Sequence, residues 1–441
     1  MSDHDSSSDQ KPDQIPDQKQ TALAVNKWQT YLNKRMLILV FLGFSSGLPL
    51  FILINLVQAW LAKSGIDIKK LGLFTLVMFP YPWKFIWSPL MDRFSFGSLG
   101  RRRGWMAFTQ VALFLCVGAM GMLDPIAQFS WVIPLAIAVA FFSASQDIVI
   151  DAFSREILDD NEQGLGAAVK VNAYKVAGLV PGALSLILAD LISWTWVFWI
   201  TAAFMLPGLF CTLLVQEPKT YGEPPKTLEE AVVLPFREFV TRSGWLNAFW
   251  ILAFIFLYRL GDTMAATLAT KFFLDLGFQL TQIGAIAKLT LFWGSIAGGV
   301  VGGVWMIKLG INRALWIFGV PQALSILGFA ILAQMGPDPL MLGIVLASEA
   351  FGVGLGTAAF VAYIARTTDP RYTATQFALF TSLAAVPRTF TTALIGYIVA
   401  STGWFNFFLI CFALAIPGML LLFKVAPWNG DQKTTANGLA L

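Results

Sequence analysis

Two acidic residues, Asp147 and Asp151, lie near the end of an apolar run that begins at Trp131. Their four-residue spacing places them on one face of a helix. An ionisable group at membrane depth costs about 2.5–3.5 kcal/mol on insertion scales, so two on one face require a watery cavity or a cationic partner. The only histidine is His4, so proton transfer within a membrane would depend on carboxylates. The candidate proton-coupling residues are Asp147, Asp151, Asp262 and Glu349.

Six basic residues share the apolar runs with these four acids, which leaves a surplus of positive charge. A buried cation without a partner gains strongly from an anion, so the surplus favours a substrate that carries carboxylates. In the alternative, the charges only pair with one another: Asp147 and Asp151 with Lys84 at a gate, and Arg259 with Asp262 three residues later. The candidate substrate-binding residues are Lys84, Gln146, Tyr174, Lys175, Arg259, Lys288, Gln376 and Arg388.

The composition indicates a membrane protein. Of the 441 residues, 57% are hydrophobic and 13% are charged, which is too apolar for a soluble domain. The basic residues are scattered over short loops, so we expect no nucleic-acid binding. Three cysteines all lie in apolar runs, and we expect neither disulfides nor a metal site nor a cofactor: Cys116, Cys211 and Cys411.

Twelve apolar runs approach the ~20 residues that a spanning helix needs, which predicts an all-α membrane protein with two six-helix halves. The expected spans are 36–61, 71–90, 105–123, 131–153, 164–188, 194–215, 245–268, 282–305, 314–334, 340–364, 373–400 and 404–423.

The polar segments divide the chain further. A disordered tail over 1–26 and a polar tail over 426–441 are expected to flank the helical halves, 27–215 and 245–425. The connection 216–244 contains apolar residues at helical spacing, which predicts an amphipathic helix on the membrane surface.

Loop charges predict that both termini are cytoplasmic. In that orientation, 20 Lys and Arg residues lie on the cytoplasmic side and four on the opposite side. The third, sixth, ninth and twelfth spans carry no charge in their interiors, so we expect them to face lipid while the others surround a polar interior.

The loop after the second span resembles the basic loop of major facilitator transporters. It begins with Asp92 and Arg93, and Arg101, Arg102 and Arg103 follow before the third span. A tight basic turn of this kind is expected to latch helix ends and gate the inward opening. A decayed copy, KLGINR, lies at 308–313 in the second half. In the alternative, these arginines only orient the chain in the membrane.

Six further motifs in one order make the chain similar to AmpG-type muropeptide permeases. They are GFSSGLPL at 43–50, KFIWSPLMDR at 84–93, SASQDIV at 143–149, YRLGD at 258–262, GTAAFVA at 356–362 and ATQFAL at 374–379. The resemblance implies proton-driven import of anhydro-muropeptides across the inner membrane of a Gram-negative bacterium. Many such permeases continue past the twelfth helix with further hydrophobic segments, whereas here a short polar tail follows.

Other functions stay open at this point. The same scaffold could import another large anionic solute, such as a siderophore or a coenzyme A thioester. A membrane-embedded acyl transferase usually needs a histidine in its polar centre, and a passive channel or scramblase needs no matched acid and base clusters. We therefore expect a monomeric transporter and not an enzyme, whose partners are a small solute, protons and membrane lipid.

Overall fold

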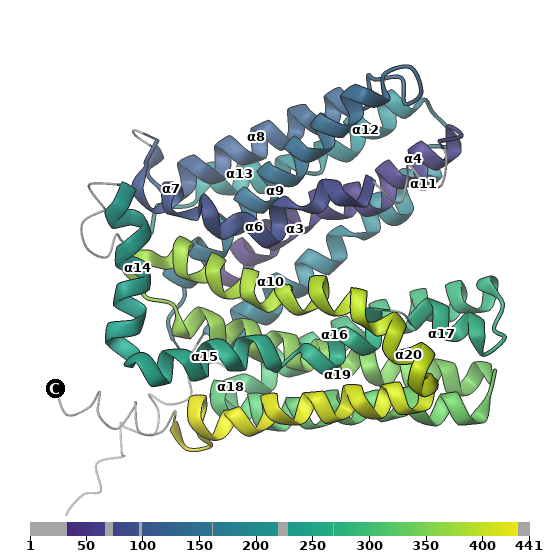
Figure 1. The fold of residues 1–441 in the computed structure, drawn as a ribbon. Helices are drawn as coiled ribbons and strands as arrows, with labels where there is room; N and C mark the ends of the chain where they lie inside the picture. Colours follow the sequence, from purple (N-terminus) through teal and green to yellow (C-terminus); the bar gives the residue numbers. More distant parts are fainter. Residues whose placement is uncertain are drawn as a thin grey trace, which may run out of the picture.

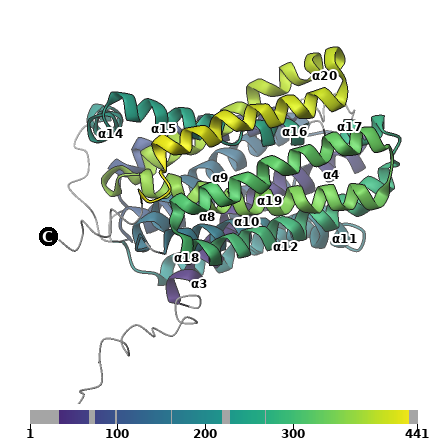
Figure 2. The ribbon, with the colours of Figure 1, turned by 90° about the horizontal axis from the view of Figure 1, so that it is seen from below.

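The structure is a computed structural model that describes residues 33–66, 74–96, 99–160, 162–218, 228–267 and 269–430. Two helical bundles lie side by side, and α14 (Leu228–Ser243) connects them along one end (Figures 1 and 2). The predicted helix in the connection is therefore present. Both predicted tails lie largely outside the described residues, as do 219–227 of the connection.

The first bundle contains the first six predicted spans. Its segments are α3 (Lys34–Phe51), a π-helical stretch (Ile52–Val57), α4 (Gln58–Lys63), a 3₁₀ stretch (Thr75–Met78), α6 (Pro80–Trp83), a 3₁₀ turn (Lys84–Ile86), α7 (Ser88–Arg93), α8 (Arg102–Met120), α9 (Phe129–Ile157), α10 (Gln163–Ala177), a second π-helical stretch (Val180–Leu184), α11 (Ser185–Leu188), α12 (Trp194–Ala203) and α13 (Leu206–Leu214).

The second bundle contains the other six. Its segments are α15 (Trp245–Leu257), α16 (Leu260–Thr267), α17 (Ala269–Asp275), α18 (Leu280–Met335), α19 (Pro339–Thr367), a 3₁₀ turn (Pro370–Tyr372) and α20 (Thr373–Val425).

Two long helices each contain two predicted spans. The chain reverses at Gly310 in α18 and at Gly403 in α20, where φ is 74° and 76°. Glycine adopts this left-handed conformation at little cost because it has no Cβ. The eighth and ninth spans therefore meet at Gly310, and the eleventh and twelfth meet at Gly403.

The second span is less regular than the continuous helix that we expected over 71–90. Short helical pieces with 3₁₀ turns follow one another from Thr75 to Arg93, and residues 71–73 are not described. Pro80, Pro82 and Pro89 explain the breaks, because proline lacks a backbone N–H and clashes with the preceding turn.

Three of the four charge-free spans, the third, sixth and twelfth, lie at the outside of their bundles. α8 and α12 lie along the edge of the first bundle farthest from the second, and the last part of α20 lies along the opposite edge (Figure 1). Large apolar side chains on these helices are exposed, among them Phe108, Trp196 and Leu420. Exposed apolar faces of this kind suit contact with lipid, as the charge pattern predicted.

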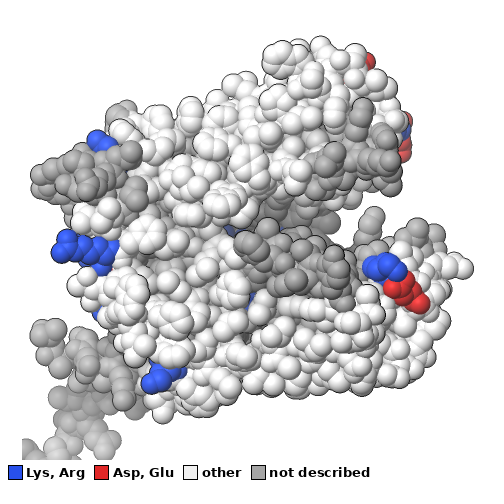
Figure 3. All heavy atoms as spheres, in the orientation of Figure 1, with Lys and Arg blue, Asp and Glu red and all other residues white. Residues whose placement is uncertain are grey.

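The two bundles touch at the end that carries α14 and separate towards the other end. Figure 3 shows the surface hollowed between them on the side away from α14. Lys and Arg side chains gather at the α14 end, in agreement with the uneven loop charges (Figure 3). The two halves are therefore in contact at one end and apart at the other.

Candidate transport site

Close packing of α3 on α10 positions several of the polar side chains. A Cβ built on Gly43 would lie 2.5 Å from the carbonyl oxygen of Lys170, and one on Gly47 would lie 2.9 Å from Cγ of Tyr174. Only glycine permits the backbones to approach this closely. The two glycines of the GFSSGLPL motif therefore hold Lys170, Tyr174 and the next residue, Lys175, beside the first helix.

Asp151 is held by two lysines. Lys170 Nζ lies 2.6 Å from Asp151 Oδ1, and Lys84 Nζ lies 3.8 Å from Asp151 Oδ2. Lys170 also lies over the ring of Phe377 in the second half, with Nζ 5.3 Å from the ring centre. Asp151 therefore pairs with Lys84 in this structure, as the ion-pairing alternative predicted. Lys170 is a nearer partner, which the sequence did not single out.

Asp147 has a different surrounding, one turn earlier on α9. Its carboxylate accepts a hydrogen bond from the hydroxyl of Ser46 on α3. The neighbouring Gln146 is fully buried and donates from Nε2 to Ser45 Oγ at 2.8 Å. Tyr174 packs edge-on against Phe51, with ring centroids 5.7 Å apart. Within the described part of the chain, Asp147 makes this hydrogen bond to Ser46 and no salt bridge.

A second charged cluster lies where α10 meets the other half. Lys175 Nζ donates to the carbonyl oxygen of Ser295 on α18 at 3.3 Å. Lys175 lies within electrostatic range of Arg259 and Glu349. Arg259 Nη2 is 3.6 Å from Asp262 Oδ2, which confirms the internal pair expected from their spacing. The cluster thus combines a lysine of the first half with basic and acidic side chains of the second half.

The contact between the halves at the α14 end is built around Asp92. Its Oδ2 accepts hydrogen bonds from the backbone N and the hydroxyl of Thr375, both at 2.8 Å. Asp92 Oδ1 also lies 2.8 Å from Nη2 of Arg102, which in turn lies 2.6 Å from Glu156 Oε1. A carboxylate at the first turn of a helix is favoured by the exposed N–H groups and the helix dipole. We call Asp92, Arg102, Glu156 and Thr375 the latch.

The other arginines of the loop contact groups of the first half, and Arg101 among them supports the latch. Arg101 Nη1 donates to the carbonyl oxygen of Asp92 at 3.1 Å, and burial followed by the charge of Arg102 lowers the pKa of Arg101. Arg103 Nη2 donates to the carbonyl oxygen of Leu213 at 2.6 Å. Arg93 lies over the ring of Phe94, 5.1 Å from its centre.

Gln376, predicted in the substrate-binding set, lies at this end of the molecule. It is 1% exposed, and its Nε2 donates to Glu238 Oε2 at 2.7 Å on α14. Its Oε1 accepts from the backbone N of Asp369 at 2.8 Å. Both polar groups are therefore used in holding α14 and the start of α20 together. When a polar residue lies in an apolar run, the sequence does not indicate which neighbouring helix its side chain will bond.

The sequence matches the Major Facilitator Superfamily over residues 36–386. The chain belongs to this superfamily. A protein of Haemophilus influenzae without a functional name is 48% identical over 413 residues, which cover 92% of this chain and 97% of that protein. The anhydromuropeptide permease of Escherichia coli is 42% identical over 390 residues, which cover 88% of this chain and 79% of that permease. The resemblance to AmpG-type permeases is therefore confirmed.

Solved structures support the superfamily fold independently of close sequence identity. The fucose:proton symporter of E. coli superposes with a TM-score of 0.69 at 11% identity, covering 88% of this chain and 98% of the symporter. Two halves of six spanning helices are the fold of this superfamily transporter, as the apolar runs predicted. Nine helical stretches of the described residues are long and apolar enough to cross a membrane, and one of them includes most of the eighth and all of the ninth span.

Two predicted site residues of this superfamily transporter, Lys288 and Arg388, have side chains that the structure does not describe. Conversely, three residues outside the predicted site make hydrogen bonds or ion pairs with residues of that site: Lys170, Ser46 and Glu156. Lys170 was visible as one of the six cations in the spans, whereas nothing in the sequence distinguished Ser46 from other buried serines.

Proposed function

We propose that this transporter imports anhydromuropeptides across the bacterial inner membrane, driven by protons. Support for the substrate comes from the 42% identity to the permease named for it and from the charged cluster between the halves. Such a solute carries free peptide carboxylates beside a sugar portion, so it requires both cations and uncharged hydrogen-bonding groups. In the proposal both termini are cytoplasmic and the hollow in Figure 3 faces the periplasm.

The proposal rests mainly on the contacts that the Lys175 side chain makes. Within the described residues, the charges of Lys84, Lys170 and Arg259 each have a carboxylate partner, whereas Lys175 donates only to the carbonyl oxygen of Ser295. A cation that makes no salt bridge is the one best able to bind a substrate carboxylate. Lys175 also lies where the two halves meet, as alternating access requires.

The function is tested with purified protein in proteoliposomes. We expect uptake of a labelled anhydromuropeptide against its gradient when the outside is made acidic, and loss of accumulation when a protonophore is added. A ferric siderophore and a coenzyme A thioester, offered in parallel, test the two other anionic solutes. Accumulation of either of these and not of the muropeptide would replace the substrate, and passive equilibration of all three would exclude symport.

The role proposed for Lys175 is tested by the charge of the solute. An anhydromuropeptide whose peptide carboxylates are converted to amides keeps its size and its sugar. We expect it to bind the wild-type protein more weakly than the acidic solute. Equal binding of both forms would show that the cationic cluster does not recognise the substrate.

A further inference from the structure

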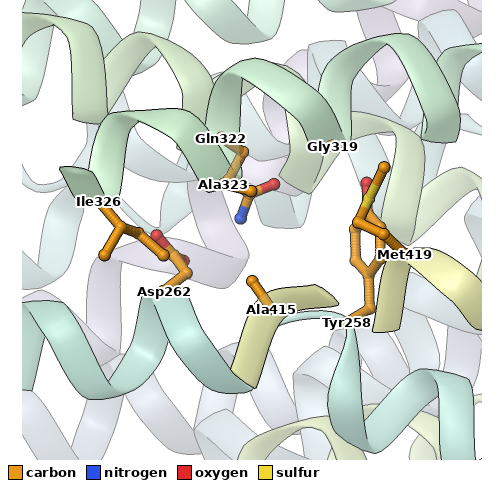
Figure 4. A pocket seen from close by; sticks show the side chains of 8 residues that line it. All are labelled: Tyr258, Asp262, Gly319, Gln322, Ala323, Ile326, Ala415 and Met419. Atoms are coloured by element: carbon orange, nitrogen blue, oxygen red, sulfur yellow. The ribbon is translucent and has the colours of Figure 1, made fainter. Parts of the chain in front are cut away.

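A small cavity lies inside the C-terminal half, apart from the contact between the two halves. It is enclosed by α16, the second part of α18 and the second part of α20. Tyr258, Gln322 and Met419 form part of its wall, together with Asp262 and Ala415 (Figure 4). The space is sufficient for about one water molecule.

Three polar atoms at this cavity lack hydrogen-bond partners among the described residues. They are Asp262 Oδ1 and both amide atoms of Gln322, and the two residues are only 7% and 4% exposed. Figure 4 shows the amide and the carboxylate extending from different helices towards the same space. Buried polar atoms are nearly always satisfied, and a carboxylate is costly to leave unsatisfied, so these atoms favour a small polar ligand here.

Water fits these walls better than a metal cation does. Only three side chains, Asp262, Gln322 and Tyr258, offer oxygen atoms, whereas hard cations take six or more oxygen ligands. The guanidinium of Arg259 already lies 3.6 Å from the other carboxylate oxygen of Asp262 and would repel a cation. A water molecule can donate to Asp262 and accept from the amide of Gln322.

We propose that this cavity binds one water molecule, which Gln322 positions against Oδ1 of Asp262. The other charged groups around Asp262 are Arg259 on the same segment and Glu349 on α19, and Lys175 lies beyond them. The water reaches Asp262 from the side of α20, away from these charges. Asp262 thereby keeps one hydrated oxygen when substrate occupies the contact between the halves. Gln322 is a positioning residue that acts through this water.

If Asp262 is one of the proton-coupling residues, its hydration affects proton exchange during transport. This consequence rests on the proposed function. A hydrated carboxylate can exchange its proton where a dry one cannot. The hydration itself is independent of the substrate. A failure to transport muropeptides would therefore leave the water site standing.

The site is tested by infrared difference spectra of the full-length protein in lipid, recorded between acidic and neutral pH. We expect a carboxylic C=O band that Asp262→Asn removes. In Gln322→Met, which keeps the length of the side chain without its polar atoms, the band should move to higher wavenumber because its hydrogen bond is lost. Ala415→Val should move it likewise by filling the cavity while leaving both polar side chains in place.

The matched control is Ser325→Ala, one turn along the same helix, where the hydroxyl donates to the carbonyl oxygen of Gln322 at 2.8 Å. This change should leave the band in place, and it separates loss of the water from general disturbance of the helix. A band that stays unmoved in both Gln322→Met and Ala415→Val would overturn the proposal. So would the absence of any titrating band that depends on Asp262.

Discussion

Asp92 and Thr375 join the two halves across more than half of the chain: Asp92 Oδ2 accepts from the Thr375 backbone N and hydroxyl, both at 2.8 Å. Both groups are buried, and the same carboxylate holds Arg102 at 2.8 Å. The halves cannot separate at the α14 end without breaking these bonds. The charge on Asp92 therefore directly stabilises the closed state of the transporter at this end.

The first prediction is that Asp92→Ala opens this end. Hydrogen bonds to a charged group contribute about 1.5–3 kcal/mol, so the ratio of open to closed molecules should rise roughly 10–150-fold. Spin labels at Phe94→Cys and Trp428→Cys, both exposed at this end, would report longer distances in a background without native cysteines. Asp338→Ala removes a comparable carboxylate cap, at Leu340 N, within one half. It should leave the distances unchanged, and equal effects of both changes would refute the latch.

The second prediction concerns Lys175. Lys175→Met keeps an unbranched side chain and removes the charge, so we expect the affinity for an acidic muropeptide to fall by about 10–150-fold, in line with ~1.5–3 kcal/mol for a charged hydrogen bond. Binding of the amidated solute should not change. Lys63→Met is the matched control, because Lys63 pairs with Asp190 in an exposed position at the other end. Wild-type affinity in the Lys175 variant, measured on folded protein, would contradict the substrate site.

The positions of the spans could be predicted because each apolar run has the length that a bilayer imposes. The breaks in the second span were also indicated in the sequence, by Pro80, Pro82 and Pro89. A hydropathy pattern alone does not record them. The direction of the chain at Gly310 and Gly403 follows from glycine's conformational freedom, but a glycine alone does not predict a reversal.

Partners across helices could not be predicted in the same way. The pairing of Asp151 with Lys84 was one of two alternatives, yet Lys170 lies nearer, because the choice depends on how α9, α10 and the second span are placed. Gln376 was expected at the substrate and instead bonds Glu238 on α14. Both cases depend on how different helices are placed relative to one another, whereas Arg259 with Asp262 needed only the pitch of one helix.

The third prediction uses two glycines on different faces of α18. A Cβ on Gly303 would lie 2.4 Å from Cβ of Ala168 in the other half, whereas one on Gly302 would lie 3.3 Å from Cα of Leu355 within the same half. Gly303→Ala should therefore push the halves apart and lower the uptake rate, while Gly302→Ala should preserve it. Uptake normalised to folded protein provides the measurement. Equal losses would indicate a packing defect of α18 alone.

The fourth prediction concerns the pH dependence of α14 docking. Burial, aided by the charge of Asp369, raises the pKa of Glu238 despite bonds from Gln376 and Arg242. The docked state therefore binds more protons than the undocked state, so docking should strengthen as pH falls through the interval between the usual and the raised pKa. A spin label at Val233→Cys paired with one at Phe94→Cys would follow docking. Glu238→Gln should remove the dependence, and an unchanged pH profile in that variant would exclude Glu238 as its source.

The last prediction separates proton carriers from structural ion pairs among Asp147, Asp151 and Glu349. Among the described residues, Asp151 pairs with two lysines and Asp147 accepts one hydrogen bond, from Ser46, so Asp151 is the better candidate for a gate and Asp147 for a carrier. We expect Asp147→Asn and Glu349→Gln to lose accumulation driven by a pH gradient and to keep solute exchange at equal pH. Asp151→Asn should impair both, because Lys84 and Lys170 then lose their shared partner. If all three variants still concentrate the solute under a proton gradient, none of these carboxylates is the carrier, and Asp262 with its neighbour Gln322 becomes the site to test.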